Sequence, residues 1–154
     1  MSALWQILDP ACVELEIKAR RKEEALAEMA GLLAAAGRIE SSADLLKALM
    51  ARERLASTGI GEGIAIPHAM LPGLEATVLA FGRKRDGLPF DAIDRRPVHL
   101  VFLLAGPPGS EFTHLQLLSH LARLLRQPEF RQGLLTASAP GELLALLRST
   151  EEEG

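Results

Sequence analysis

The residues that could do chemistry in this chain lie close together between Arg52 and His68, in the sequence RERLASTGIGEGIAIPH. Three glycines at alternate positions precede the histidine: Gly59, Gly61 and Gly63. Glycine accepts positive φ and lets main-chain N–H groups approach a common point, while Ser57 and Thr58 add hydroxyl donors. Arg52 adds a permanent positive charge. This set suits an anion, and because a histidine ends the loop, we predict a phosphoryl group carried on His68 by nucleophilic catalysis.

The stretch from Arg52 to His68 also fits other kinds of loop. A glycine-rich turn before a strand is also common in purely structural loops. No Gly-Lys-Ser/Thr follows, which excludes a Walker loop, and no helix begins after the third glycine, which excludes a dinucleotide-binding fingerprint. From its position alone, Arg52 is better explained as a charge placed at a helix C-terminus than as a phosphate ligand.

A metal-dependent hydrolase is a further alternative. It would use His68, His99 and His114 as ligands, but no Asp/Glu/His cluster at ligand spacing supports it, so we expect no metal. His99 is interpreted most simply as a core or strand-end histidine with a main-chain partner. His120 lies six residues after His114 and about 120° around a helix from it, which predicts a surface position.

The run STGIGEGIAIPHA resembles the active-site segment of the type-2 enzyme IIA domains (fructose, mannitol and nitrogen-regulatory) of the bacterial phosphoenolpyruvate-dependent sugar phosphotransferase system. The resemblance continues through PVHLVFLLAGP and THLQLLSHLARLLR and covers nearly the whole chain. It implies that His68 is the phosphorylated histidine, His114 the second active-site histidine and Arg52 the arginine near the phosphate. Many relatives carry arginine or lysine two places after the histidine; Met70 here departs from that pattern and changes the charge around the phosphate.

The resemblance also implies function and partners. A phosphohistidine carrier takes a phosphoryl group from phospho-HPr, or from its nitrogen-branch counterpart, and passes it to a sugar-specific enzyme IIB. The alternative is a nitrogen-regulatory enzyme IIA, whose phosphorylation state controls a transporter or a sensor kinase. Either is a protein-histidine phosphotransferase, and we expect no cofactor, because the loop amides, Arg52 and the two hydroxyls can stabilise the transferred charge. For docking we expect a shallow apolar rim around His68, formed by Ile64, Ile66, Met70 and Leu71.

Composition sets limits that agree with this hypothesis. The 154 residues carry a net charge of −3 and are 48% hydrophobic, which predicts one domain (1–154) with one core and no nucleic-acid surface. Cys12 is the only cysteine, so no intramolecular disulfide can form. No run approaches the ~18 apolar residues of a membrane span, so we expect a cytoplasmic protein without membrane insertion.

Hydrophobic periodicity predicts the elements that must position these residues. Strands are expected over 12–17, 64–67, 77–82 and 98–104, and helices over about 25–36 and 42–54. A capping box of Thr113 and Gln116 would start the next helix and place His114 in its first turn, where the helix N-terminus keeps an imidazole neutral and attracts phosphate. Two further helices are expected after Pro128 and Ser138, and the final EEEG is expected to be solvated, as is the turn at RKRDG (83–87).

The run VHLVFLLA is apolar on both faces apart from its histidine, which predicts a central strand covered on both sides by helices. The elements do not alternate strictly between strand and helix, which argues against a doubly wound parallel fold. The predicted fold is an α/β, three-layer α/β/α sandwich with a mixed central sheet. The resemblance implies the same architecture, of the phosphotransferase/anion transport protein type.

Overall fold

The computed structural model describes residues 3–153. Its strands are β1 (Leu8–Glu14), β2 (Gly59–Gly61), β3 (Ile64–Ala65), β4 (His68–Met70), β5 (Val78–Leu88) and β6 (Val98–Gly106). Its helices are α1 (Leu4–Ile7), α2 (Lys22–Ala35), α3 (Ser42–Glu53), α4 (Glu111–Leu125), α5 (Pro128–Thr136) and α6 (Pro140–Glu153). The strands form one mixed sheet in the order β1-β5-β6-β3-β2, and β4 also pairs with β6.

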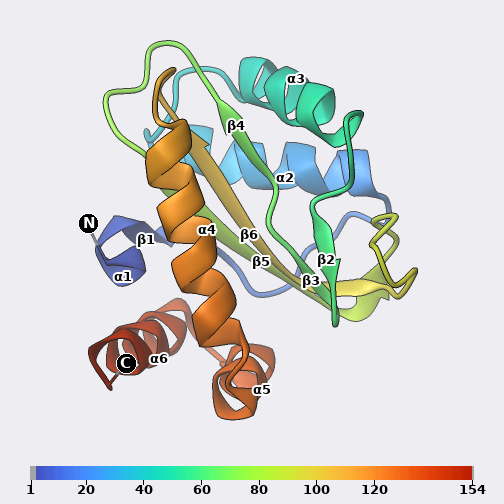
Figure 1. Cartoon of the computed structure of the whole chain (residues 1–154), viewed down its shortest axis with the longest axis vertical. Helices are drawn as coiled ribbons and strands as arrows, with labels where there is room; N and C mark the ends of the chain where they lie inside the picture. Colours follow the sequence, from blue (N-terminus) through green and yellow to red (C-terminus); the bar gives the residue numbers. More distant parts are fainter. Residues whose placement is uncertain (1–2, 154) are drawn as a thin grey trace.

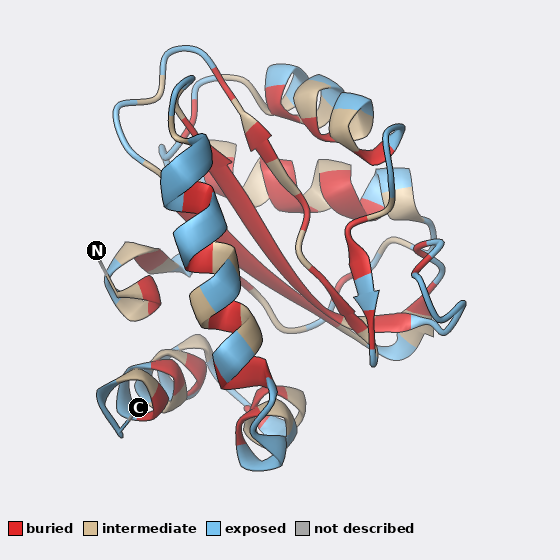
Figure 2. Ribbon diagram, in the orientation of Figure 1, coloured by how far each residue is buried: buried red, intermediate tan, exposed pale blue. Residues whose placement is uncertain are grey.

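Strand β6 is the centre of the sheet. It runs antiparallel to β5 on one side and parallel to both β3 and β4 on the other. Eight of its nine residues are buried, because helices cover both faces: α4 lies in front of the sheet in Figure 1 and α2 behind it. The predicted central strand and the three-layer α/β/α sandwich with a mixed sheet are therefore confirmed (Figures 1 and 2).

The first two long helices were predicted within a few residues. The Ser41 side chain accepts the N–H of Asp44 at 3.1 Å and caps α3, and Gly37 takes a φ of 71° after α2. The capping-box prediction for α4 is wrong, since this helix begins at Glu111, with Ser110 as its N-cap and no side-chain capping bond. His114 nevertheless lies in the first turn, where its N–H donates to the Ser110 carbonyl at 2.9 Å.

Two segments predicted to be a solvated turn (83–87) and a solvated tail (151–154) belong to regular elements and are only partly solvated. Arg85, Asp86, Glu152 and Glu153 are exposed, and Gly154 lies outside the described residues. Strand β5 continues through 83–87 to Leu88, and the buried Arg83 side chain donates to carbonyls of two other segments: Leu15 after β1, and Leu134 and Ala137 at the end of α5. At the C-terminus, α6 extends to Glu153, and Glu151 accepts the N–H groups of Leu4 and Trp5 at 2.9 and 2.8 Å. These bonds join the two ends of the chain.

Within residues 3–153 no helix is both long enough and apolar enough to cross a membrane.

Candidate active site

His68 begins β4, at the point where the chain rejoins β6 after an interruption. Strand β3 pairs with β6 as far as Ala65, and pairing resumes at His68, opposite Leu104. The imidazole is partly exposed, and its Nδ1 lies 2.9 Å from the Ile66 carbonyl oxygen. A carbonyl only accepts hydrogen bonds, so Nδ1 carries the proton in the neutral ring. The lone pair is then on Nε2, which makes Nε2 the nucleophilic atom.

His114 faces His68 from helix α4. The two ring centroids are 6.4 Å apart and the ring planes cross at 77°. The His114 side chain is only 2% exposed, and neither ring nitrogen has a hydrogen-bond partner among the residues that the structure describes. Burial lowers the pKa of His114, and the charge of His68 lowers it further, against a smaller opposing effect of Glu111. His114 is therefore a neutral buried imidazole with unused hydrogen-bonding capacity, an unusual state that calls for a functional explanation.

Gly106, the last residue of β6, makes room for the His114 ring. A Cβ atom at this position would lie 2.4 Å from Nε2 of His114 and 2.6 Å from Oγ of Ser110. Any other residue would displace both side chains. Gly106 was not among the predicted site residues, although a glycine that ends a run of apolar strand residues is a known signal of close approach.

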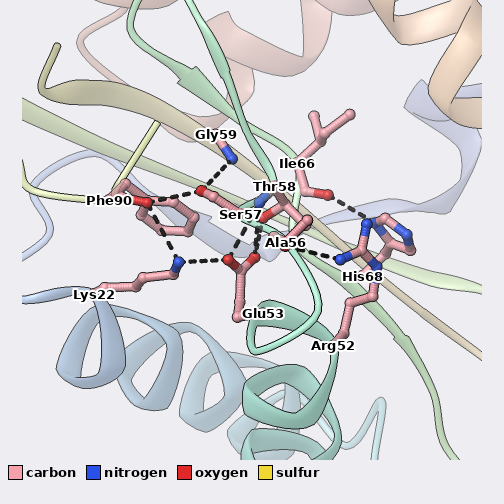
Figure 3. A network of polar contacts seen from close by, with 10 residues as sticks. All are labelled: Lys22, Arg52, Glu53, Ala56, Ser57, Thr58, Gly59, Ile66, His68 and Phe90. Atoms are coloured by element: carbon pink, nitrogen blue, oxygen red, sulfur yellow. Dashed lines mark hydrogen bonds and ion pairs between the residues drawn. The ribbon is translucent and has the colours of Figure 1, made fainter. Parts of the chain in front are cut away.

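Arg52 reaches the site from the last turn of α3, the helix that packs against β4. Its Nη1 donates to the Ala56 carbonyl at 2.9 Å, a bond drawn in Figure 3 together with the His68 ring. The structure thus brings together two of the residues predicted to do the chemistry, His68 and His114, and places Arg52 on the helix that packs against β4.

Ser57 and Thr58 have a different role from the predicted one. The Thr58 hydroxyl donates to the buried Glu53 carboxylate, and the Ser57 hydroxyl donates to the Phe90 carbonyl at 2.8 Å (Figure 3). Each hydroxyl has one hydrogen, so neither has a donor left for a phosphoryl group on His68. The prediction that they donate to phosphate is corrected: they hold the loop between α3 and β2.

The three glycines do not form an amide cradle around His68. Gly61 and Gly63 have φ values of 95° and 79° and close the β2–β3 hairpin. Ile64, which follows them, pairs with Leu100, four residues along β6 from the partner of His68, or about 13 Å at 3.3 Å per residue. Gly59 donates its N–H to Ser57, and a Cβ there would contact Ala92 at 2.8 Å. The prediction that the loop N–H groups gather around His68 is therefore wrong: the positive φ angles of Gly61 and Gly63 allow the hairpin turn.

The predicted apolar rim is also corrected. Ile64 and Leu71 are buried, and Ile66 and Met70 are only partly exposed. Sδ of Met70 lies 3.1 Å from the Ser110 hydroxyl, at the start of α4. The exposed large apolar residues nearest to the site in the sequence are Phe112 and Leu115, on either side of His114, and Leu55, three residues after Arg52.

His99 lies apart from this cluster. Its N–H donates to the Gly63 carbonyl beside the hairpin turn, and its Nδ1 lies 3.0 Å from the carbonyl oxygens of Lys84 and Arg85. The simple interpretation of His99 as a strand-end histidine with main-chain partners is confirmed. The three histidines of the metal-hydrolase alternative are not assembled, and residues 3–153 contain no group of three or more His, Cys, Asp or Glu able to hold a metal ion.

The prediction for His120 is wrong. Its side chain is 19% exposed, and its Nε2 lies 2.8 Å from a carboxylate oxygen of Glu151. It belongs to the contact between α4 and α6.

Comparison with known families identifies the chain. Residues 6–150 match the family described as "Phosphoenolpyruvate-dependent sugar phosphotransferase system, EIIA 2". The chain belongs to this family. The predicted resemblance is thereby confirmed, and with it the general role of a phosphoryl carrier of the phosphotransferase system.

Relatives of two functional kinds are similar to the chain. It is 38% identical to the fructose-specific EIIA component of Haloferax volcanii over 127 residues, which cover 82% of each protein. It is 35% identical to the nitrogen regulatory protein of Escherichia coli K12 over 151 residues, which cover 96% of this chain and 91% of that one. It is also 36% identical to the fructose-specific EIIABC component of Bacillus subtilis over 149 residues, but spans only 24% of that protein's length.

Solved structures show the same fold. The crystal structure of nitrogen regulatory protein IIA-Ntr from Neisseria meningitidis superposes with a TM-score of 0.85 at 37% identity, covering 93% of this chain and 97% of that one. The mannitol IIA of E. coli gives a TM-score of 0.76 at 26% identity, covering 91% and 98% of the two chains. The E. coli mannitol IIA has also been solved in complex with the phosphorylated mannitol enzyme IIB.

Proposed function

We propose that this protein carries a phosphoryl group on Nε2 of His68, between a phosphohistidine donor protein and an acceptor protein. The observation that carries the proposal is the juxtaposition of a partly exposed imidazole, held by the Ile66 carbonyl, with a buried and unpartnered second imidazole. Family membership supplies the class of reaction. Donors of the HPr type, including the nitrogen-branch form, fit the accepting step, and enzyme IIB fits the donating step.

The bonds formed and broken in phosphoryl transfer can be accounted for without a cofactor. The lone pair of His68 Nε2 attacks phosphorus in line, a new N–P bond forms, and the N–P bond of the donor breaks with its electron pair returning to the donor ring. His68 keeps its Nδ1 proton, so its ring becomes cationic, and the Ile66 carbonyl stabilises that charge through the existing hydrogen bond. Transfer to the acceptor reverses these events.

Two side chains act on the phosphoryl oxygens. The Arg52 guanidinium, which is permanently charged, stabilises the charge that spreads over these oxygens in the transition state. His114 stays neutral because of its lowered pKa, and one of its unpartnered nitrogens donates an N–H to the phosphoryl group. That bond would satisfy a buried polar atom that otherwise has no partner, so it favours the phosphorylated form.

Docking of the donor requires an apolar surface beside the two histidines. Phe112 and Leu115, which are 69% and 64% exposed on the first turns of α4, fit this requirement better than the largely buried residues predicted from sequence. They lie on the exposed side of the first turns of α4, the helix whose buried side carries His114.

The test is incubation with phosphoenolpyruvate, enzyme I and HPr, followed by intact mass measurement and acid treatment. We expect an acid-labile gain of one phosphoryl group that is absent from His68→Ala. Labelling of the His68→Ala variant at the wild-type level would refute the proposal. Circular dichroism of both proteins controls for folding.

A second candidate is a regulatory module whose phosphorylation state controls binding to a transporter or sensor kinase. Nitrogen regulatory proteins favour it, because they match the chain over 85–97% of both lengths at 35–37% identity. Adding a purified fructose-type enzyme IIB to the phosphorylated protein separates the candidates. Loss of the phosphoryl group to enzyme IIB supports sugar transport, while retention, together with state-dependent binding to a regulated partner, supports control.

A further inference from the structure

Glu53 is a buried carboxylate next to the site that no part of the transfer mechanism uses. Its side chain is 2% exposed and lies 2.5 Å from the ammonium group of Lys22 on α2. Its two oxygens each accept the Thr58 N–H at 3.2 Å, and one of them also accepts the Thr58 hydroxyl (Figure 3). Glu53 therefore fixes both the main chain and the side chain of one loop residue, and Lys22 compensates its buried charge.

The bonds continue from Thr58 to the nucleophile. The Thr58 carbonyl accepts the Ile66 N–H at 3.0 Å, and the Ile66 carbonyl accepts the His68 Nδ1–H at 2.9 Å. Ile66 lies between β3 and β4, outside the residues that pair with β6. The bond from Thr58 holds Ile66 on one side, and the central strand holds the next residue, since the Pro67 carbonyl accepts the Leu104 N–H at 3.0 Å. Movement of Thr58 would therefore disturb one of the two anchors of the segment whose carbonyl holds His68.

We propose that Glu53 is a positioning residue for His68. It acts through Thr58 and Ile66 to keep the proton of the neutral imidazole on Nδ1 and to aim Nε2 outward. It contacts no reacting atom and so is not a catalytic residue. The importance of this position for phosphoryl transfer rests on the function proposed above, but the effect on the imidazole itself can be measured in the unphosphorylated protein.

A matched control exists elsewhere in the molecule. Glu151 on α6 is also a buried carboxylate, with a side chain 4% exposed. It accepts two main-chain N–H groups, from Leu4 and Trp5, and lies 2.8 Å from Nε2 of His120. Its bonds lead to α1 and to His120 in the second half of α4, and not to the loop that holds His68. A Glu151→Ala variant loses a comparable set of contacts but keeps the hydrogen bonds that connect Glu53 to the His68 imidazole.

The experiment compares the wild-type protein with Glu53→Ala, Glu53→Gln and Glu151→Ala. Long-range ¹H–¹⁵N NMR of the unphosphorylated proteins, at a pH where the histidine rings are neutral, reports which ring nitrogen carries the proton. We expect a single Nδ1–H form in the wild type and in Glu151→Ala, and a mixture of both forms in Glu53→Ala. Glu53→Gln keeps an oxygen that accepts the Thr58 N–H, so it should restore the Nδ1–H form.

Phosphoryl transfer from phospho-HPr gives an independent measurement on the same four proteins. We expect Glu53→Ala to lower the maximal rate about 5–10-fold, the effect of losing one orienting hydrogen bond, with an unchanged half-saturating donor concentration. Glu53→Gln should recover most of this loss, and Glu151→Ala should show none. If Glu53→Ala does not fold, the double variant Lys22→Met/Glu53→Met replaces it, because it leaves no unpaired buried charge.

The outcomes separate the two proposals. A single Nδ1–H form in folded Glu53→Ala, or in the folded double variant, overturns the positioning role whatever the rates are. An equal shift of the His68 tautomer in Glu151→Ala also overturns it, since the effect would then be one of general destabilisation. Failure of the wild type to be phosphorylated at His68 refutes the proposed function, and the tautomer measurement then decides the role of Glu53 alone.

Discussion

Two histidines of this protein, His68 and His99, are held in the same way at opposite ends of the β3–β4 edge of strand β6. Each ring is partly exposed and places Nδ1 within 3.0 Å of a main-chain carbonyl. His68 has a second imidazole 6.4 Å away and lies on the strand against which the helix of Arg52 packs. His99 packs beside Gly63 of the hairpin turn and Gly87 of β5. A fixed tautomer is therefore not enough for a carrier site; the neighbouring groups distinguish the two rings.

The glycines of the loop contribute to the second region and not to the first. Gly61 and Gly63 close the hairpin beside His99, and the loop residues Ser57 and Thr58 form internal bonds. What serves His68 instead is an ordered path of hydrogen bonds from the end of α3. Substitutions around His68 should therefore affect phosphoryl transfer more than substitutions around His99.

The largest effect is expected from Arg52→Ala. Removing the guanidinium leaves the charge of the transferring group without its cationic partner, so transfer from phospho-HPr should slow about 100-fold. Arg52→Lys keeps the charge but loses the planar fork and should give an intermediate rate. Rapid-quench measurement of phosphorylation tests both variants. A wild-type rate for folded Arg52→Ala would remove Arg52 from the site.

Gly106→Ala should displace the His114 ring and leave His68 as the only imidazole placed to contact the phosphoryl group. The added Cβ would lie 2.4 Å from Nε2 of His114, so the ring must move, and we expect transfer to slow about tenfold with a loss of about 1–3 kcal/mol of stability. Gly31→Ala is the matched control, because nothing lies within 4 Å of its added Cβ. Equal transfer rates in Gly106→Ala and Gly31→Ala would contradict the role given to His114.

Stability should depend on pH through His114. Its pKa is lowered in the folded protein, so below about pH 6.5 the unfolded chain binds a proton that the folded protein does not. His114 therefore does not lower the free energy of unfolding above this pH, and this free energy falls as the pH decreases toward the lowered pKa. Urea denaturation between about pH 7.5 and 5.5 should show a shallower fall for His114→Leu than for the wild type. An identical slope would contradict a buried neutral His114.

The smallest effect on transfer is expected from His99→Ala. This variant loses the bonds from Nδ1 to the Lys84 and Arg85 carbonyls, so we expect it to be less stable by about 1–2 kcal/mol. Its transfer rate should stay within about twofold of the wild type, because His99 lies at the hairpin end of the sheet. Thermal denaturation and the same phosphorylation assay measure the two quantities. A large loss of transfer in the folded variant would extend the site to the hairpin.

Local patterns in the sequence predicted the elements and the reacting groups. The central strand, helices α2 and α3 and the grouping of His68 with His114 follow from periodicity and from the resemblance. The partners of Ser57 and Thr58 could not be predicted in this way. The hydroxyl of Ser57 bonds to Phe90, 33 residues away, and only the packed fold reveals that contact.

Glycine was the least predictable residue type. Positive φ at Gly61 fits a cradle or a hairpin equally well, and only the pairing with β3 decides between them. Gly106 matters because of a side chain eight positions later, His114, that the start of α4 turns back onto it. Both cases depend on strand register and on the first residue of a helix, which sequence patterns define poorly.

The central claim is that Nε2 of His68 carries the phosphoryl group. Long-range ¹H–¹⁵N NMR of the phosphorylated protein, combined with ³¹P NMR, assigns the phosphorus to one ring nitrogen of one histidine. We expect phosphorus on Nε2 of His68, with the proton still on Nδ1. Phosphorus on Nδ1 of His68, or on any other side chain, would contradict the mechanism proposed here.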